Sequence, residues 1–389
     1  MIERGPGRNL SGGNVPLADH PVGYDPGEGA MSARPGVSII VDNYNSERFV
    51  AEAIESALAQ DHERTEVIVV DDGSTDGSRE IIERYANRAT LILLPENRGQ
   101  VRAINEAWPQ ASHEILIFLD GDDILMPNAA STIAENWHGG LSKMQFLLAS
   151  IDSQCRSLGH VAPKYPEELD TETIRREILR TGSYPCPQAC GNAYAKSFLE
   201  KLAPIGGLPW MDMILEVNAP FYGEIFTLRK PLACYRIHEN NDSGQTVDDP
   251  GRFARYARIF EEKLDYLEQR CHLLGIEFDN EAARQRALWY LELKLTEAKI
   301  EPRQTYSYCR GLDCARRALR AVFRSPHTWR QRLFRATWLT LVALSPRFIA
   351  QRLIRLRYIV PDRPRWIENL IGPKLAPLAA LFWIGGSQS

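Results

Sequence analysis

Four short apolar runs recur in the first third of the chain, and the segments between them repeat apolar residues at helical spacing. The runs are VSIIVDNYN, TEVIVVDDGSTDGS, TLILLPENRG and EILIFLDGDD, and the segments between them are SERFVAEAIESALAQ, SREIIERYAN and GQVRAINEAWPQA. Ser46 is expected to cap the first helix, in which Val50, Ile54 and Leu58 share a face. This alternation with short links predicts a doubly wound α/β fold whose sheet is largely parallel.

Three of the predicted strands end in acids or amides. These endings are Asp42-Asn43-Tyr44-Asn45, Asp71-Asp72 and Asp120-Gly121-Asp122-Asp123. Ligands of open α/β sheets bind at the carboxyl ends of the strands, so we expect the three endings to converge on one binding edge. The alternative is that such residues cap turns and helices, which is the better account for Asp76 and Asn128. Capping does not explain three acidic strand ends on the same side.

No glycine-rich phosphate loop follows the first predicted strand, so a bound diphosphate would need another source of positive charge. Asp120 and Asp122 leave the fourth strand with only Gly121 between them, and glycine is expected to let a ligand approach closely. Hard carboxylate oxygens suit Mg²⁺ or Mn²⁺, which keep open positions for phosphate oxygens. A divalent cation would also make the carboxylate cluster tolerable, because it supplies positive charge.

In this order and spacing, the motifs resemble the nucleotide-binding half of family 2 glycosyltransferases with the GT-A fold. The resemblance rests on VSIIVDNYN, VIVVDDGSTDGS, ENRGQVRAIN and FLDGDDILMP, and it covers roughly residues 36–245. It implies transfer of a sugar from a nucleoside-diphosphate sugar to an acceptor hydroxyl, with inversion at the anomeric carbon. The Q-x-x-R-W signature of processive synthases is missing, which favours one sugar per acceptor.

The resemblance also implies roles for individual residues on the donor side. The positions matched to the donor and its loop are Asp42, Tyr44, Asp72, Asn97, Gly99, Arg102 and Asp120. Asp72 matches the carboxylate that reads the base edge, which favours UDP, although the family usually has a small or hydroxyl residue at the position of Asp42. Asp122 matches the direct ligand of Mg²⁺ or Mn²⁺. His238, in an R-x-H motif, is expected to ligate the metal or to bond the diphosphate, with a structural role as the alternative.

The acceptor side must supply a general base, because the acceptor hydroxyl loses its proton as it attacks. Family members carry an acidic motif at the start of a helix, and in GGLPWMDMILEV the matching residue is Asp212, with Met211 in place of the usual Glu. Asp212 could instead be only an acid favoured by the helix dipole, in which case Glu216 is the reserve base. The expected acceptor is a glycan or a lipid-linked saccharide of cell-envelope or extracellular polysaccharide synthesis.

Regions outside the resemblance differ in composition. Residues 1–35 are rich in Gly and Pro and carry no apolar secretory signal, so we expect a disordered tail, with a translation start at Met31 as an open alternative. Residues 246–300 read as helices that pack on the catalytic domain, and residues 301–389 read as a basic helical extension. The seven cysteines are expected as reduced thiols in the cytoplasm, rather than as a zinc site at Cys186 and Cys190.

The extension is unusually rich in arginine. Between Arg303 and Arg365 the chain has 15 Arg, no Lys and only two acids, and residues 326–389 interleave Arg with Trp, Phe, Leu and Ile. The apolar run ATWLTLVALSP is too short to span a bilayer. We therefore expect an amphipathic segment on an anionic membrane surface, at its cytoplasmic face. Packing or an oligomer contact is the alternative, and nucleic acid binding is not expected without a recognisable module.

Two other functions compete with glycosyl transfer. A sugar nucleotidyltransferase would need a glycine-rich loop bearing Arg or Lys where this chain has VDNYNSERF. A catalytically degenerate nucleotide-sugar-binding protein or membrane scaffold would not be expected to retain Asp72, Asp120, Asp122 and a candidate base. The sequence leaves open the sugar, the acceptor, the linkage and the oligomeric state.

Overall fold

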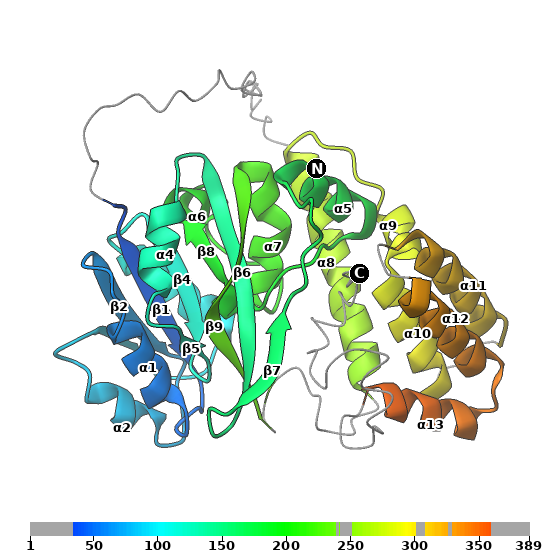
Figure 1. Cartoon of the computed structure of the whole chain (residues 1–389), viewed down its shortest axis with the longest axis horizontal. Helices are drawn as coiled ribbons and strands as arrows, with labels where there is room; N and C mark the ends of the chain where they lie inside the picture. Colours follow the sequence, from blue (N-terminus) through cyan, green and yellow to red (C-terminus); the bar gives the residue numbers. More distant parts are fainter. Residues whose placement is uncertain (1–33, 239–240, 242–250, 301–307, 326–328, 359–389) are drawn as a thin grey trace, which may run out of the picture. The chain divides into compact units, whose positions relative to one another are not determined.

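The computed structural model describes residues 34–238, 241, 251–300, 308–325 and 329–358. Most of the predicted tail, the alternative start at Met31 and the C-terminal segment beyond residue 358 lie outside the described residues. Within them, nine strands form one sheet in the order β3-β2-β1-β4-β8-β6-β9-β5, and β7 pairs with β6 (Figure 1). The strands are β1 (Val37–Asn43), β2 (Thr65–Asp71), β3 (Thr90–Leu93), β4 (Ile115–Asp120), β5 (Ile124–Leu125), β6 (Leu141–Asp152), β7 (Ser157–Ala162), β8 (Asn192–Ala195) and β9 (Glu224–Ile237).

The first four strands are parallel, as predicted, and the rest of the sheet is mixed. β1 lies between β2 and β4, and β3 pairs with the far side of β2. β8 is antiparallel to both β4 and β6, while β6 and β9 are parallel to each other. The register places Asp42 beside Asp120 and Asn43 beside Asp71, so the acidic ends of β1, β2 and β4 meet at one edge. This convergence confirms the expectation drawn from the sequence.

Helices cover both faces of the sheet, because successive strand residues point to opposite sides. On one face Ile39, Val41 and Ile117 pack against α1 (Val50–Leu58), α2 (Ser78–Glu83) and α4 (Ala129–Asn136). On the other face Ile40, Val70 and Phe118 share a core with the helices α3 (Gln100–Ala107), α5 (Thr171–Thr181), α6 (Lys196–Leu202) and α7 (Met211–Tyr222). Together these two cores form the doubly wound arrangement that the sequence predicts.

A third core belongs to the C-terminal helices. These are α8 (Arg252–Leu273), α9 (Asn280–Arg286), α10 (Leu288–Ile300), α11 (Tyr308–Arg324), α12 (Trp329–Leu344) and α13 (Arg347–Tyr358). Their shared core includes Phe260, Leu293 and Leu339. The buried Lys263 of α8 reaches Glu216 of α7, with its Nζ 2.8 Å from Oε2, and thereby joins this layer to the sheet domain. No helix in the described part of the chain is both long and apolar enough to cross a membrane.

Two local expectations are corrected by the structure. Ser46 does not cap α1, because residues 46–49 form a turn and the N-cap position belongs to Phe49, which makes no side-chain cap. The arginines of the extension are also not all on the surface. Arg335 and Arg357 are buried and bind the two carboxylate oxygens of Glu292 at 3.0 and 2.7 Å. Part of the basic composition therefore serves an internal ion-pair network.

Candidate active site

A bridging amide holds the ends of β1 and β4 together. The Nε2 of Gln100, the first residue of α3, donates to Oδ2 of Asp42 at 3.0 Å and to Oδ1 of Asp120 at 3.1 Å. Burial raises the pKa of Asp42 to about 7, against the bond from Gln100 and with further upward contributions from Asp122 and Asp72. Burial, followed by the charge of Asp42, also raises the pKa of Asp120 well above its usual range. The carboxylates of Asp42 and Asp120 therefore lie close together without a positively charged side chain among the described residues to stabilise their ionised forms.

Asp122 meets the end of β9 through a contact with His238. Its Oδ2 lies 2.9 Å from Nε2 of His238, whose ring packs against Phe49 at 4.8 Å between centroids. Asn241 supports this contact, since its Oδ1 accepts the backbone N–H of His238 at 2.6 Å. Two residues more than 100 positions apart are thus brought within bonding distance, and Asn241 is a neighbour that sequence reasoning missed.

Arg236 fixes the backbone of the acidic loop. Its guanidinium is fully buried, donates from Nε to the carbonyl of Asp122 at 2.6 Å and pairs with Glu52 of α1 at 2.6 Å. The backbone N–H of Arg236 donates to Oδ1 of the buried Asp123 at 2.8 Å. Asp123 therefore braces the loop.

The acidic edge has the chemistry of a divalent cation site. One carboxylate oxygen each from Asp120, Asp122 and Asp123 lies within 4.8 Å of the others. Oδ1 of Asp42 and Oδ2 of Asp123 are buried without a hydrogen-bond partner, and no Lys or Arg of the described residues forms an ion pair with Asp42 or Asp120. Mg²⁺ or Mn²⁺ would bind these hard carboxylate oxygens and supply the positive charge that they lack.

Gly121 packs closely on the end of β1. A Cβ at this position would lie 2.8 Å from Oδ1 of Asn43 and 3.2 Å from the carbonyl of Asp42. Asn43 cannot easily withdraw, because its Nδ2 donates to the buried Asp71 at 2.8 Å. The glycine therefore lets the acidic loop pack on β1, a reason for its small size that the sequence did not indicate.

We expect Gly121→Ala to destabilise the fold by about 1–3 kcal/mol, because the added methyl group overpacks this contact. Gly139→Ala is the matched control, since a Cβ there meets nothing within 4 Å. Chemical denaturation of both variants measures the difference. Equal stabilities of the two would show that the loop yields freely and that the packing argument is wrong.

The loop after β3 is held by Asp72. Its two carboxylate oxygens accept the backbone N–H groups of Arg98 at 3.0 Å and Gly99 at 2.8 Å. Gly99 has a φ of +91°, which favours glycine, and its N–H also lies 3.1 Å from Oδ1 of Asn97. Asp72 thus holds in place the loop that is predicted to contact the donor. Each of its carboxylate oxygens keeps a second lone pair that can accept one further hydrogen bond.

Two predicted donor contacts lie in the open at this edge. Tyr44 follows β1 with 46% of its surface exposed, so its ring is accessible to a flat ligand. Arg102 extends from α3 and lies 3.8 Å from Glu106, with both side chains about half exposed. Its guanidinium is not held against the acidic edge by any short contact in the described residues.

Asp212 lies in the first turn of α7, at the end that faces the acidic edge. Burial raises the pKa of its carboxyl, and the charge of Glu216 acts in the same direction. The N–H of Met213, Lys263 and Lys143 oppose this rise, and the Asp212 charge in turn raises the pKa of Asp120. The candidate base and the carboxylate cluster therefore belong to one electrostatic environment.

Glu216, the reserve base, is occupied by other contacts. Its Oε1 accepts the hydroxyl of Ser183 at 2.8 Å and its Oε2 pairs with Lys263 at 2.8 Å. Both carboxylate oxygens of Glu216 are therefore engaged by neighbouring side chains and are not open to an acceptor hydroxyl. This arrangement leaves Asp212 as the better candidate.

A buried lysine near Asp212 escaped sequence reasoning. Lys143 of β6 is fully buried, and its Nζ donates to the hydroxyl of Tyr184 at 2.9 Å and to Sγ of Cys186 at 3.0 Å. It lies 5.4 Å from the centre of the Tyr184 ring. A lone Lys in the strand sequence LSKMQFLLAS gives no signal of this role, because a lysine between apolar residues normally reads as a solvent-facing position.

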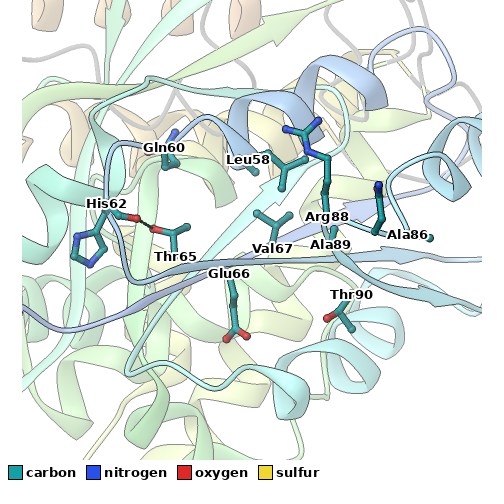
Figure 2. A pocket seen from close by; sticks show the side chains of 12 residues that line it. Leu58, Gln60, His62, Thr65, Glu66, Val67, Ala86, Arg88, Ala89 and Thr90 are labelled. Atoms are coloured by element: carbon teal, nitrogen blue, oxygen red, sulfur yellow. Dashed lines mark hydrogen bonds between the residues drawn. The ribbon is translucent and has the colours of Figure 1, made fainter.

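A cavity of about 470 Å³ lies at the opposite end of the sheet. Figure 2 shows it beside Thr65 and Thr90, the first residues of β2 and β3. Its polar lining is bonded within the protein, since Glu66 accepts from Ser38 at 2.5 Å and Arg88 pairs with Glu55. The cavity is therefore not part of the candidate site.

Comparison with known proteins identifies a glycosyltransferase domain in the sheet part of the chain. The glycosyl transferase family 2 model matches residues 38–202. An uncharacterized glycosyltransferase of Nostoc sp. is 35% identical over 214 residues, which are 53% of this chain and 66% of that protein. A putative teichuronic acid biosynthesis glycosyltransferase of Bacillus subtilis, TuaG, is 39% identical over 93 residues, 23% of this chain and 37% of that protein. The chain therefore spans just under two thirds of the first relative and about a third of the second.

Among solved structures, residues 1–349 of Staphylococcus aureus TarS in complex with UDP-GlcNAc align with a TM-score of 0.49 and 20% identity, covering 83% of this chain and 91% of that one. The fold of the present chain is of the GT-A type, an α/β nucleotide-sugar transferase architecture with C-terminal helices. Residues 38–202 of this chain form a glycosyl transferase family 2 domain.

Proposed function

We propose that this glycosyltransferase moves one sugar from a nucleoside-diphosphate donor, with UDP favoured, to an acceptor hydroxyl with inversion. The observation that carries the proposal is the meeting of Asp42, Asp120, Asp122 and Asp212 in one electrostatic environment at the carboxyl edge of β1 and β4. Among the described residues, Asp120, Asp122 and Asp123 are the one group of acidic, histidine or cysteine side chains placed closely enough to hold a metal ion.

The donor nucleotide would bind between the ends of β1 and β2. The exposed Tyr44 ring offers a stacking surface for the base, and Asp72 retains lone pairs for a ring N–H such as that of uracil. Gln100 keeps Asp42 and Asp120 in place beside the ribose and sugar. Asn97 and Gly99 shape the adjoining loop, and Arg102 is free of any close tie to the acidic edge and can turn toward the donor phosphates.

Asp122 and His238 would hold Mg²⁺ or Mn²⁺, with Asp120 close by. When bound, the ion neutralises the diphosphate and stabilises it as the leaving group. The residues of the chain do the rest of the positioning, since Arg236 fixes the carbonyl of Asp122 and Asp123 anchors the same loop to β9.

Asp212 would remove the proton from the acceptor hydroxyl as the oxygen attacks the anomeric carbon. Burial holds its pKa above the ordinary range, which suits a carboxylate that must gain a proton during the reaction. The charges of Lys143 and Lys263 oppose that rise. The acceptor would bind beside the start of α7, where Asp212 lies.

The acceptor is proposed to be a glycan or lipid-linked saccharide of cell-envelope polysaccharide synthesis. The support is the relationship to a protein named for teichuronic acid biosynthesis, together with the family assignment. Nucleotide sugars are made inside cells, so the proposed place of the reaction is the cytoplasmic face of the membrane.

The proposal is tested with a panel of UDP-, GDP- and dTDP-sugars at saturating Mn²⁺, by measuring release of nucleoside diphosphate without an acceptor. At least one UDP-sugar should be hydrolysed slowly above background, and chelation of the metal should stop the release. A folded protein that consumes no donor of the panel would contradict the proposal. That result would favour the alternative of a nucleotide-sugar-binding protein without catalytic activity.

A further inference from the structure

Exposed apolar side chains gather on the last three described helices. Ten large hydrophobic side chains are exposed in the described part of the chain, and seven of them lie in or beside α11, α12 and α13. We call these seven the apolar surface: Phe323, Trp329, Leu333, Leu341, Leu344, Phe348 and Ile349. Isolated exposed apolar residues are ordinary, but a concentration of this kind marks an interaction surface.

The helix α12 is apolar on both of its sides. Trp338, Leu339 and Val342 are buried in the core of the C-terminal helices. Trp329, Leu333 and Leu344 fall on the opposite side of the helix, at 69%, 59% and 63% exposure. A surface helix normally has one apolar stripe and one polar face, so a second apolar face indicates a second apolar environment.

The charged residues around the apolar surface are nearly all positive. Within 308–325 and 329–358 the only acid is Asp313, and it pairs with Arg316 and Arg317. Arg335 and Arg357 are neutralised internally by Glu292. The exposed arginines that remain near the seven apolar residues in sequence are Arg320, Arg324, Arg330, Arg347, Arg352 and Arg355.

We propose that the apolar surface docks onto an anionic lipid bilayer, with its aromatic and aliphatic side chains in the acyl boundary and the exposed arginines at the lipid phosphates. Trp and Phe beside Arg suit this interface, because the rings are amphipathic or apolar while the guanidinium groups stay in water. A second copy of the chain is disfavoured, since a symmetric contact would bring the same arginines together. Nucleic acid would engage the arginines but would leave the apolar side chains in water.

The proposal is tested by sedimenting the full-length protein with phosphatidylcholine vesicles, with and without phosphatidylglycerol. We expect binding that requires phosphatidylglycerol and weakens as salt is added, because the arginines act through screened charge. The double variant L333E/L344E should lower the vesicle-bound fraction at least about tenfold, since carboxylates would face the acyl boundary and the lipid phosphates.

The matched control is Leu273→Glu, which places the same charge at an exposed leucine of α8 that lies outside the apolar surface, at 72% exposure. This variant should bind vesicles like the wild type. Circular dichroism checks that each variant is folded. If L333E/L344E is unfolded, the milder Trp329→Ser takes its place in the vesicle assay. Neither set of residues belongs to the acidic edge, so vesicle binding and donor hydrolysis can fail separately.

Several outcomes would overturn the membrane assignment. One is a wild-type protein that stays in the supernatant with anionic vesicles, and another is a double variant that binds as well as the wild type. A dimer by light scattering that L333E/L344E dissociates would assign the surface to a second copy. Equal retention by a polyanion such as RNA, unaffected by L333E/L344E, would assign the arginines to nucleic acid.

Discussion

Asp122→Asn is expected to reduce sugar transfer by about 10³-fold, or about 4 kcal/mol of transition-state stabilisation. The substitution keeps the size of the side chain but removes the charge that faces His238 at 2.9 Å. Without that charge the acidic loop loses a hard anionic ligand for the divalent cation, and the leaving diphosphate loses its neutralising partner. Donor hydrolysis rates give the first measurement, and calorimetric titration with Mn²⁺ alone gives a second that does not depend on activity.

The matched control for this variant is Asp61→Asn, which removes one carboxylate from an exposed position away from the acidic edge. It should leave the hydrolysis rate and Mn²⁺ binding unchanged. If Asp122→Asn binds Mn²⁺ as tightly as the wild type, Asp122 is not a metal ligand. If it also retains full activity, the proposed division of roles within the acidic loop is wrong.

Asp212→Asn is expected to lower the rate constant of transfer by about 10²–10⁴-fold while leaving donor affinity nearly unchanged. Asparagine keeps the shape but cannot accept the acceptor proton, and Asp212 lies on the helix side of the site rather than among the proposed donor contacts. Steady-state kinetics separate the two effects, and UDP titration reports donor affinity independently.

The competing explanation for Asp212 is a purely structural acid at a helix start, which would contribute about 0.3–1 kcal/mol to stability. Glu172→Gln removes a comparable acid from the first turn of α5 and controls for that effect. Both variants should lose little stability, whereas only Asp212→Asn should lose transfer. Full transfer by Asp212→Asn would leave the reaction without its proposed base.

The pH dependence of the rate follows from the same residue. A general base must be ionised, so the rate falls as the pH drops below its pKa. Burial and the charge of Glu216 raise the pKa of Asp212, so the fall should occur at higher pH than for an ordinary aspartate, whose pKa is about 4. A pH profile of kcat/KM for the wild type measures this limb. A fall of kcat/KM near pH 4, about the pKa of an ordinary aspartate, would mean that Asp212 is solvated during the reaction.

The parallel half of the fold could be predicted from sequence because its signals are local. Runs such as VSIIVDNYN combine β-branched residues with a polar end, and the parallel register then brings Asp42 level with Asp120 without further information. The convergence of Asp122 and His238 was also predictable, although only through the family resemblance, since their positions in the sequence are far apart.

What escaped prediction depends on contacts between distant segments. Gln100 reads as an ordinary helix residue, yet its amide bridges two buried carboxylates. Lys143 interrupts an apolar strand, and only the fold shows that its ammonium group donates hydrogen bonds to Tyr184 and Cys186. Arg335 and Arg357 could not be told from surface arginines until Glu292 was placed between them. In each case the partner lies at least 20 residues away, beyond the reach of periodicity or capping rules.

The central claim is that the acidic edge binds a nucleotide through a divalent cation, and it is tested most directly by calorimetric titration of UDP into the wild-type protein with and without Mn²⁺. We predict saturable binding in Mn²⁺ that disappears when the ion is removed by a chelator, because the cation would offset the negative charge of both the carboxylates and the diphosphate. Binding of equal affinity with and without Mn²⁺ would contradict the account.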